Sequence, residues 1–104
     1  MTLPLVRRLA DLPADLCAEQ ISTLTSGSHF RLEHILSGAH TSAADFWYDQ
    51  AQAEWAILLA GSAVLEFEQG TVRMQAGDAL LIPAHLKHRV AQSTDAVWLA
   101  LHFD

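Results

Sequence analysis

Hydrophobic and polar residues alternate along much of the chain beyond residue 20, with the two-residue period of strands that bury one face. Positions 30–37 show the pattern: one face carries Phe30, Leu32, His34 and Leu36. This alternation predicts a strand and places His34 on its apolar face. Residues 21–25 are rich in β-branched side chains, which predicts another strand before the turn at 26–28.

Later segments repeat the pattern between short turns. Residues 55–60 are continuously apolar, which is typical of a buried strand, and Gly61-Ser62 predicts a turn before 63–67. Further strands are expected over 72–76, 79–82, 88–92 and 96–103, with turns at 69–70, 76–78 and 93–95. Pro83 ends the strand predicted over 79–82, because proline cannot donate to a central ladder. The pattern predicts eight or nine strands.

Two segments depart from the strand pattern. Asp11 and Pro13 suit the N-cap and first turn of a short helix, so a helical turn is expected over 11–16. Residues 38–53 have no clear period and surround an aromatic stretch at 46–48, which predicts a long loop, and loops of this length are often functional.

The predicted strands favour an all-β fold. Many short antiparallel strands close into a barrel or a two-sheet jelly roll, because closure removes exposed edges. No linker or repeat divides the 104 residues, which suit a single domain over 1–104.

Composition excludes several classes of protein. Hydrophobic residues make up 51% and charged residues 17%, which excludes a disordered chain. The net charge of −6 argues against a nucleic-acid partner. No apolar stretch is long enough to span a bilayer, so no membrane partner is expected. Cys17 is the only cysteine and cannot form an internal disulfide, which favours a cytoplasmic location.

The region from Tyr48 to Gln92 resembles the two signature motifs of the cupin superfamily. In the first motif region, 48–61, Glu54 is followed by six residues and Gly61, as in the family. Tyr48 and Gln50 stand where cupins usually carry two metal-binding histidines. The resemblance implies a double-stranded β-helix barrel in which half of the usual metal ligands are replaced.

The second motif region, 77–92, keeps more of the cupin pattern. Gly77, Pro83 and His88 stand at the family's glycine, proline and metal-binding histidine. His85 replaces the second glycine of the motif and Gln92 replaces its asparagine. The resemblance also implies a homodimer, since cupins commonly pair strands across barrels.

A degenerate metal site is the first hypothesis drawn from this resemblance. Gln50, Glu54 and His88 would hold a divalent ion at the barrel mouth, and imidazole and carboxylate ligands suit Zn, Fe(II), Mn, Ni or Cu. The ion would act as a Lewis acid or oxygen-activating centre, and whether the protein is an enzyme stays open. Candidate residues of the surrounding ligand pocket are His34, Tyr48, His85, Trp98 and His102.

Two further hypotheses remain open. In the second, the protein is a metal-free cupin that binds or senses a small polar molecule, which the loss of two motif histidines favours. In the third, it is a dimeric β-barrel without catalytic function. The individual residues also have structural interpretations: His34 and His102 as core histidines, and Glu54 as an ion-pair partner of Arg89 or Lys87.

Overall fold

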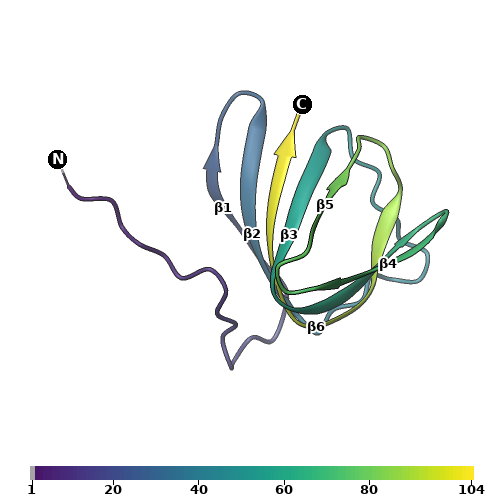
Figure 1. Cartoon of the computed structure of the whole chain (residues 1–104), viewed down its shortest axis with the longest axis horizontal. Coiled ribbons are helices and arrows are strands. Elements are labelled where there is room, and N and C mark those ends of the chain that lie inside the picture. Colours follow the sequence, from purple (N-terminus) through teal and green to yellow (C-terminus); the bar gives the residue numbers. More distant parts are fainter. Residues whose placement is uncertain (1) are drawn as a thin grey trace.

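The regular structure consists entirely of β-strands in one antiparallel sheet (Figure 1). The computed structural model describes residues 2–104. Its strands are β1 (Gln20–Ser26), β2 (Phe30–Gly38), β3 (Ala53–Phe67), β4 (Gly70–Gln75), β5 (Ala79–Ile82) and β6 (His88–Phe103). Their order is β1-β2-β6-β3-β4, and β5 pairs with the first part of β3.

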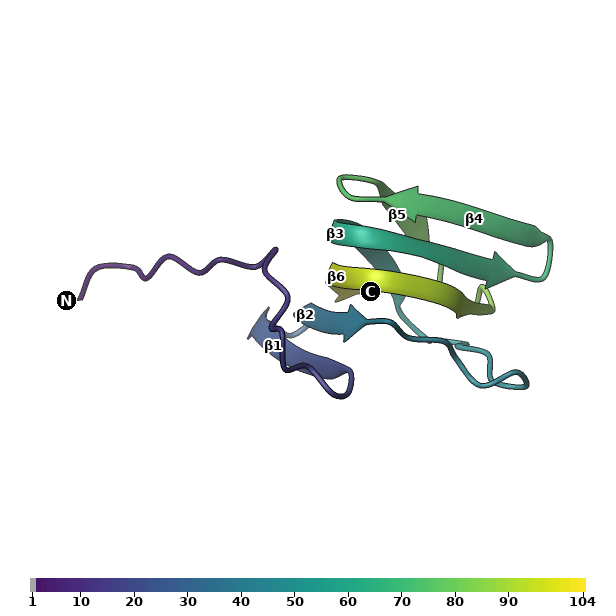
Figure 2. The same cartoon turned by 90° about the horizontal axis from the view of Figure 1, so that it is seen from below.

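Long strands β3 and β6 give the sheet its shape. They pair with each other from Ala53↔Phe103 to Phe67↔His88, along nearly their whole length. Both strands bend, so the sheet folds over on itself (Figures 1 and 2). One wall contains β1, β2, β5, the first half of β3 and the second half of β6. The other contains β4 and the remaining halves of β3 and β6.

The bends correct two sequence predictions. Turns were expected at 61–62 and 93–95, but Gly61 and Asp95 lie inside continuous strands. Both have positive φ, 79° and 51°, and the β3–β6 register shifts on both sides of Ala60. A Cβ at Gly61 would collide with the backbone carbonyls of Thr94 and Asp95. Because each bent strand occupies both walls, the prediction of eight or nine strands is wrong, and residues 2–104 form six.

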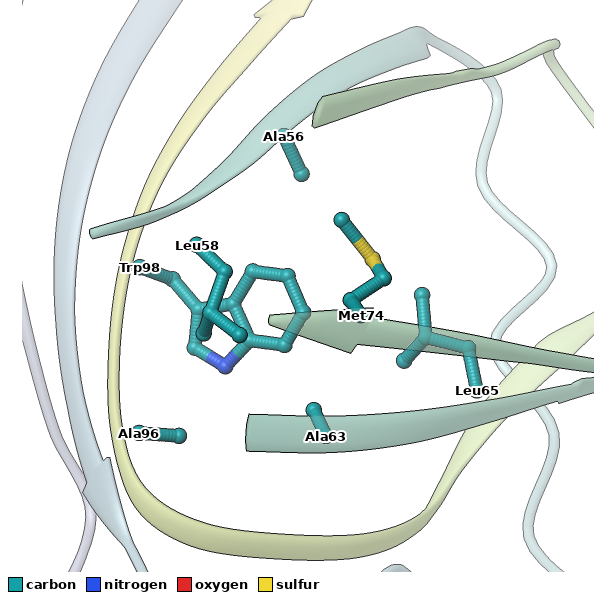
Figure 3. Close-up of a cluster of buried hydrophobic side chains, with 7 residues drawn as sticks. All are labelled: Ala56, Leu58, Ala63, Leu65, Met74, Ala96 and Trp98. Carbon is teal, nitrogen blue, oxygen red and sulfur yellow. The ribbon is translucent and has the colours of Figure 1, made fainter. Parts of the chain in front are cut away.

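The core fills the space between the two walls (Figure 3). Leu58 is fully buried, and the indole of Trp98 lies among small side chains that leave room for it. The buried cluster consists of Ala56, Leu58, Ala63, Leu65, Met74, Ala96 and Trp98.

The N-terminal segment contains no helix. Instead of the helical turn expected over 11–16, a single turn is closed by the Leu16 N–H, which donates to the Pro13 carbonyl at 3.3 Å. One such bond fixes too few residues to nucleate a helix. Residues 2–8 extend away from the barrel, and Leu3 and Leu5 are exposed (Figure 2). Among residues 2–104 there is no helix that could cross a membrane.

Candidate functional site

A cavity of about 130 Å³ lies between the two walls. Its apolar lining comes from both walls, with Ile35 of β2, Leu65 of β3 and Trp98 of β6. Its titratable lining residues are Glu19, Glu33, Tyr48, Glu54, His88 and His102. An engineered cavity of about 150 Å³ admits benzene. A group of about six non-hydrogen atoms is therefore comparable in size to this space.

Glu54 and His88 come to the cavity from different strands. Glu54 is the second residue of β3, where it pairs with Ile82 of β5 and His102 of β6. His88 is the first residue of β6. The two residues are 34 positions apart in the sequence, and the fold brings both to the lining of one cavity.

His88 is held in one orientation. Its side chain is buried and stacks on Tyr48, with the ring centroids 5.3 Å apart and an angle of 25° between the rings. Nδ1 lies 3.0 Å from the Leu86 carbonyl oxygen. A carbonyl can only accept a hydrogen bond, so Nδ1 carries the proton. In the neutral ring Nε2 then has a lone pair, and no partner for it is found within residues 2–104.

Tyr48 is fixed to His88 through the backbone as well. The Tyr48 N–H donates to the His88 carbonyl at 2.7 Å, and the His88 N–H donates to the Tyr48 carbonyl at 3.1 Å. Burial raises the pKa of the Tyr48 phenol, and the negative charges of Glu19 and Glu54 raise it further. At neutral pH Tyr48 is therefore a phenol that can donate a hydrogen bond, and is unsuited to ligate as a phenolate.

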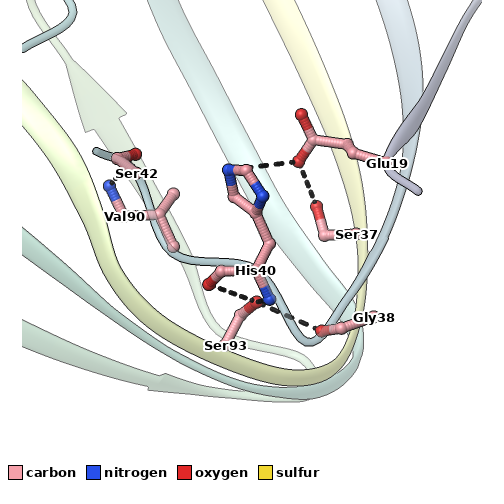
Figure 4. A network of polar contacts seen from close by, with 7 residues as sticks. All are labelled: Glu19, Ser37, Gly38, His40, Ser42, Val90 and Ser93. Carbon is pink, nitrogen blue, oxygen red and sulfur yellow. Dashed lines mark hydrogen bonds and ion pairs between the residues drawn. The ribbon is translucent and has the colours of Figure 1, made fainter. Parts of the chain in front are cut away.

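The sequence predicts a long loop over 38–53, and the observed loop runs over 39–52, between β2 and β3. Contacts with β6 hold the rest of this loop. Ser42 exchanges hydrogen bonds with Val90: its N–H donates to the Val90 carbonyl at 2.9 Å, and its Oγ accepts from the Val90 N–H at 3.1 Å. Ser93 Oγ accepts from the His40 N–H at 2.8 Å (Figure 4). Glu19 accepts a bond of 2.8 Å from Ser37 Oγ beside them. These contacts order the loop that carries Tyr48 into the cavity.

Gln50 has an unpaired acceptor. Its side-chain Oε1 is buried and has no hydrogen-bond partner among the described residues, while its carbonyl accepts from the His85 N–H at 2.7 Å. A buried oxygen without a partner costs about 1–3 kcal/mol. The side chain lines the cavity, so a group entering the cavity can supply the missing donor.

His102 stands between two carboxylates. Its Nε2 donates to Glu33 Oε1 at 2.9 Å, and its Nδ1 lies 3.9 Å from Glu54 Oε1. Glu33 also accepts from Arg31 Nε at 3.0 Å. Both carboxylate oxygens of Glu33 therefore accept a hydrogen bond. The Glu54 side chain accepts none from the described residues.

The structural interpretation of Glu54 as a partner of Arg89 or Lys87 does not hold. Arg89 lies 3.6 Å from Glu66 instead, and donates to the carbonyls of Ser42 and Ala44.

The sequence analysis missed Glu33 and Glu19 as cavity residues. The outer face of β2 is apolar too, so its even-numbered positions looked like the buried face. Only the β2–β6 pairing shows that Glu33 and Ile35 point inward.

The remaining predicted pocket residues divide into two groups. Trp98 and His102 line the cavity. His34 instead lies on the outer side of β2, where its Nε2 is 2.7 Å from the Leu9 carbonyl oxygen. Its neighbours in sequence, Glu33 and Ile35, line the cavity, so alternation turns His34 away. His85 is also outside the cavity lining, exposed and 2.8 Å from Asp49.

The donor set is incomplete for a metal ion. Residues 2–104 contain no group of three His, Cys, Asp or Glu side chains arranged to hold one. Glu54 and His88 are ordinary ligands, and Gln50 offers only a neutral amide oxygen. His102 donates Nε2 to Glu33 and has its Nδ1 3.9 Å from Glu54 Oε1. Catalytic zinc sites typically use three ordinary protein ligands. The site therefore groups fewer ordinary ligands than a catalytic zinc site of that kind uses.

Comparisons with known proteins agree with the fold. The family model described as Cupin domain matches residues 32–102. The structure resembles that of a proposed mannose-6-phosphate isomerase from Ralstonia eutropha JMP134, with 37% identity, a TM-score of 0.89 and coverage of 97% of this chain and 99% of the other.

More distant structures share the fold alone. A cupin superfamily protein from Desulfitobacterium hafniense DCB-2 has 18% identity, a TM-score of 0.78 and coverage of 97% and 94% of the two chains. KdgF from Halomonas sp. has 17% identity, a TM-score of 0.71 and coverage of 89% and 86%. A search of curated proteins finds no match. On the family match and the Ralstonia relative, this chain belongs to the cupin domain family.

Proposed function

We propose that this protein binds a small polar molecule in the cavity between its two walls. Glu54, Gln50 and His88 would recognise the molecule. The observation that carries the proposal is that an acceptor in each of these three side chains lacks a partner among the described residues, while Glu33 beside them is paired with Arg31 and His102. The Gln50 oxygen is buried, and a buried polar group without a partner is costly and calls for an explanation.

Ligand binding to the folded state alone stabilises a protein by mass action. A thermal-shift screen of small polar metabolites should therefore raise the melting temperature with at least one compound. His88→Ala should abolish that shift, because it removes one recognising group. Lys87→Ala, an exposed neighbouring substitution, should leave it unchanged. A shift that survives His88→Ala would locate the binding site elsewhere.

Carbonyl isomerisation is a second candidate function. The Ralstonia relative is a proposed mannose-6-phosphate isomerase with 37% identity. Such a reaction needs a base that moves a proton from the hydroxyl-bearing carbon to the neighbouring carbonyl carbon. It also needs an acid that donates a proton to the carbonyl oxygen while the hydroxyl oxygen gives one up. In this cavity Glu54 is an unpaired carboxylate and Tyr48 is a neutral phenol within range of its charge, so the two have the required chemistry.

The second candidate is tested by an exchange experiment. If the protein isomerises mannose 6-phosphate, NMR in deuterated water should show interconversion with fructose 6-phosphate and uptake of solvent deuterium. Glu54→Gln keeps the shape of the side chain and removes the base, so we expect a rate at least about 100-fold lower. Equal rates for the two proteins would eliminate Glu54 as the base.

Metal binding through Gln50, Glu54 and His88 stays a prediction from the family resemblance. Its support here is that all three line one cavity and that Oε1 of Gln50 is unpaired. Two ordinary ligands and an amide should bind weakly. Elemental analysis after incubation with Zn, Mn or Fe(II) should find metal that Glu54→Ala and His88→Ala both remove. Protein that takes up no metal under these conditions would contradict the prediction.

A further inference from the structure

The cavity presents hydrogen-bond acceptors and negative charge to whatever enters it. Three carboxylates, those of Glu19, Glu33 and Glu54, belong to its lining. No lysine or arginine among the described residues lines it. The nearest guanidinium to these carboxylates, that of Arg31, binds Glu33 and is itself partly exposed.

The groups left without protein partners are mostly acceptors. The Glu54 side chain accepts no hydrogen bond from the described residues, and Gln50 Oε1 is buried and unpaired. Nε2 of His88 has a free lone pair because Nδ1 donates to the Leu86 carbonyl. The Tyr48 hydroxyl adds a donor at one side of the cavity. A complementary ligand must therefore bring several donors and little or no negative charge.

From this lining we infer that the buried part of the ligand is a compact hydroxyl- or amino-bearing group without negative charge, and that the cavity rejects phosphate and carboxylate groups. The inference rests on the proposed binding function and names its ligand class. Glu54 decides the charge preference, because it alone of the three carboxylates receives no hydrogen bond. A carboxylate or phosphate beside it would add a like charge in a poorly solvated space.

The size of the cavity also argues against a buried phosphate group. A space of about 130 Å³ holds a group of about six non-hydrogen atoms, fewer than a hexose phosphate contains. A phosphorylated sugar could therefore place only its hydroxyl-bearing end among Glu54, Gln50 and His88, with its phosphate outside. This differs from sites that use arginine or lysine to hold the phosphate.

Three probes of equal size test the inference. Serinol, glycerol and lactate have the same number of non-hydrogen atoms, and at neutral pH carry a positive, zero and negative charge. Dissociation constants come from NMR titration of amide resonances at 50, 54 and 88, in the presence of EDTA so that a metal ion cannot mediate binding. We expect serinol to bind at least about tenfold more tightly than lactate, with glycerol between them.

Charge variants show whether Glu54 is responsible. In Glu54→Gln the affinities for serinol and lactate should come within about threefold of each other, because the unpaired charge is gone. The matched control Glu68→Gln removes one negative charge outside the cavity and should preserve the order. The wild-type comparison of the three probes remains decisive even if Glu54→Gln does not fold.

The outcomes separate the two proposals. Lactate binding as tightly as serinol, with shifts at the cavity resonances, would overturn the ligand class and leave the binding function standing. No shift at those resonances with any of the three probes would overturn the binding function, and the ligand class with it. The order serinol, glycerol, lactate, lost in Glu54→Gln alone, would support both.

Discussion

Single residues set the chemistry of this cavity, and Tyr48 is the one whose ionisation can be followed directly. It is the only tyrosine of the chain, so the ultraviolet absorbance of phenolate reports on it alone. We expect a pKa above the ordinary 10.0, mainly because of burial. Glu54→Gln should lower that pKa toward 10.0, since it removes one of the two neighbouring charges. A value unchanged by the substitution would show that Glu54 does not act on the phenol.

The same shift predicts how stability depends on pH. The phenol ionises at about 10 in the unfolded chain and at higher pH in the folded protein, so between these values the folded state binds more protons. This contribution is fully present below pH of about 10 and is lost as pH rises through the folded pKa. Urea denaturation at several alkaline pH values should show the loss, and Tyr48→Phe should show less of it.

Gln50 provides a second prediction at this scale. Replacing it with methionine keeps the length of the side chain and removes the unpaired buried oxygen. We expect Gln50→Met to raise the free energy of unfolding by about 1 kcal/mol, while binding of serinol or glycerol is lost. Gln92→Met, at an exposed position, should change neither. A destabilised Gln50→Met protein would mean that Oε1 is already satisfied, for instance by an ordered water.

At the scale of elements, the bends of β3 and β6 decide where the two walls meet. Gly61→Ala should be strongly destabilising, because φ is 79° and the new methyl group would meet the carbonyls of Thr94 and Asp95. Gly77→Ala is the matched control: φ is also positive, 94°, but the added carbon meets open space. We expect Gly61→Ala to cost at least about 2 kcal/mol more than Gly77→Ala in urea denaturation.

Comparing the observed strands with the predicted ones explains which elements a sequence pattern can locate. β1, β2, β4 and β5 were predicted nearly to their ends, because each is short and bounded by a turn or by Pro83. At Gly61 and Asp95 the sequence predicts turns, whereas the strands continue and bend. A glycine with positive φ looks the same in sequence whether the chain reverses or merely bends, and only the partner strand distinguishes the two cases.

At the scale of the whole molecule, homodimerisation stays a prediction from the cupin resemblance. Large apolar side chains are exposed at several places. Leu3 and Leu5 of the N-terminal segment are 87% and 92% exposed, and Trp55 and its β5 partner Leu81 are 39% and 57% exposed. Such surface is typical of an interface. Sedimentation at micromolar concentration should show a dimer. A monomer at that concentration would contradict the prediction.

The sequence by itself determined the all-β class, the cupin motif spacing and the two motif residues Glu54 and His88 that line the cavity. These follow from local rules: side-chain alternation, turn residues and fixed offsets. Tertiary structure alone decided that Glu33 and Glu19 face the cavity and that His34 does not. Both faces of β2 carry apolar residues, so alternation cannot say which face is inside. That choice depends on the pairing of β2 with β6, which joins residues about 70 positions apart.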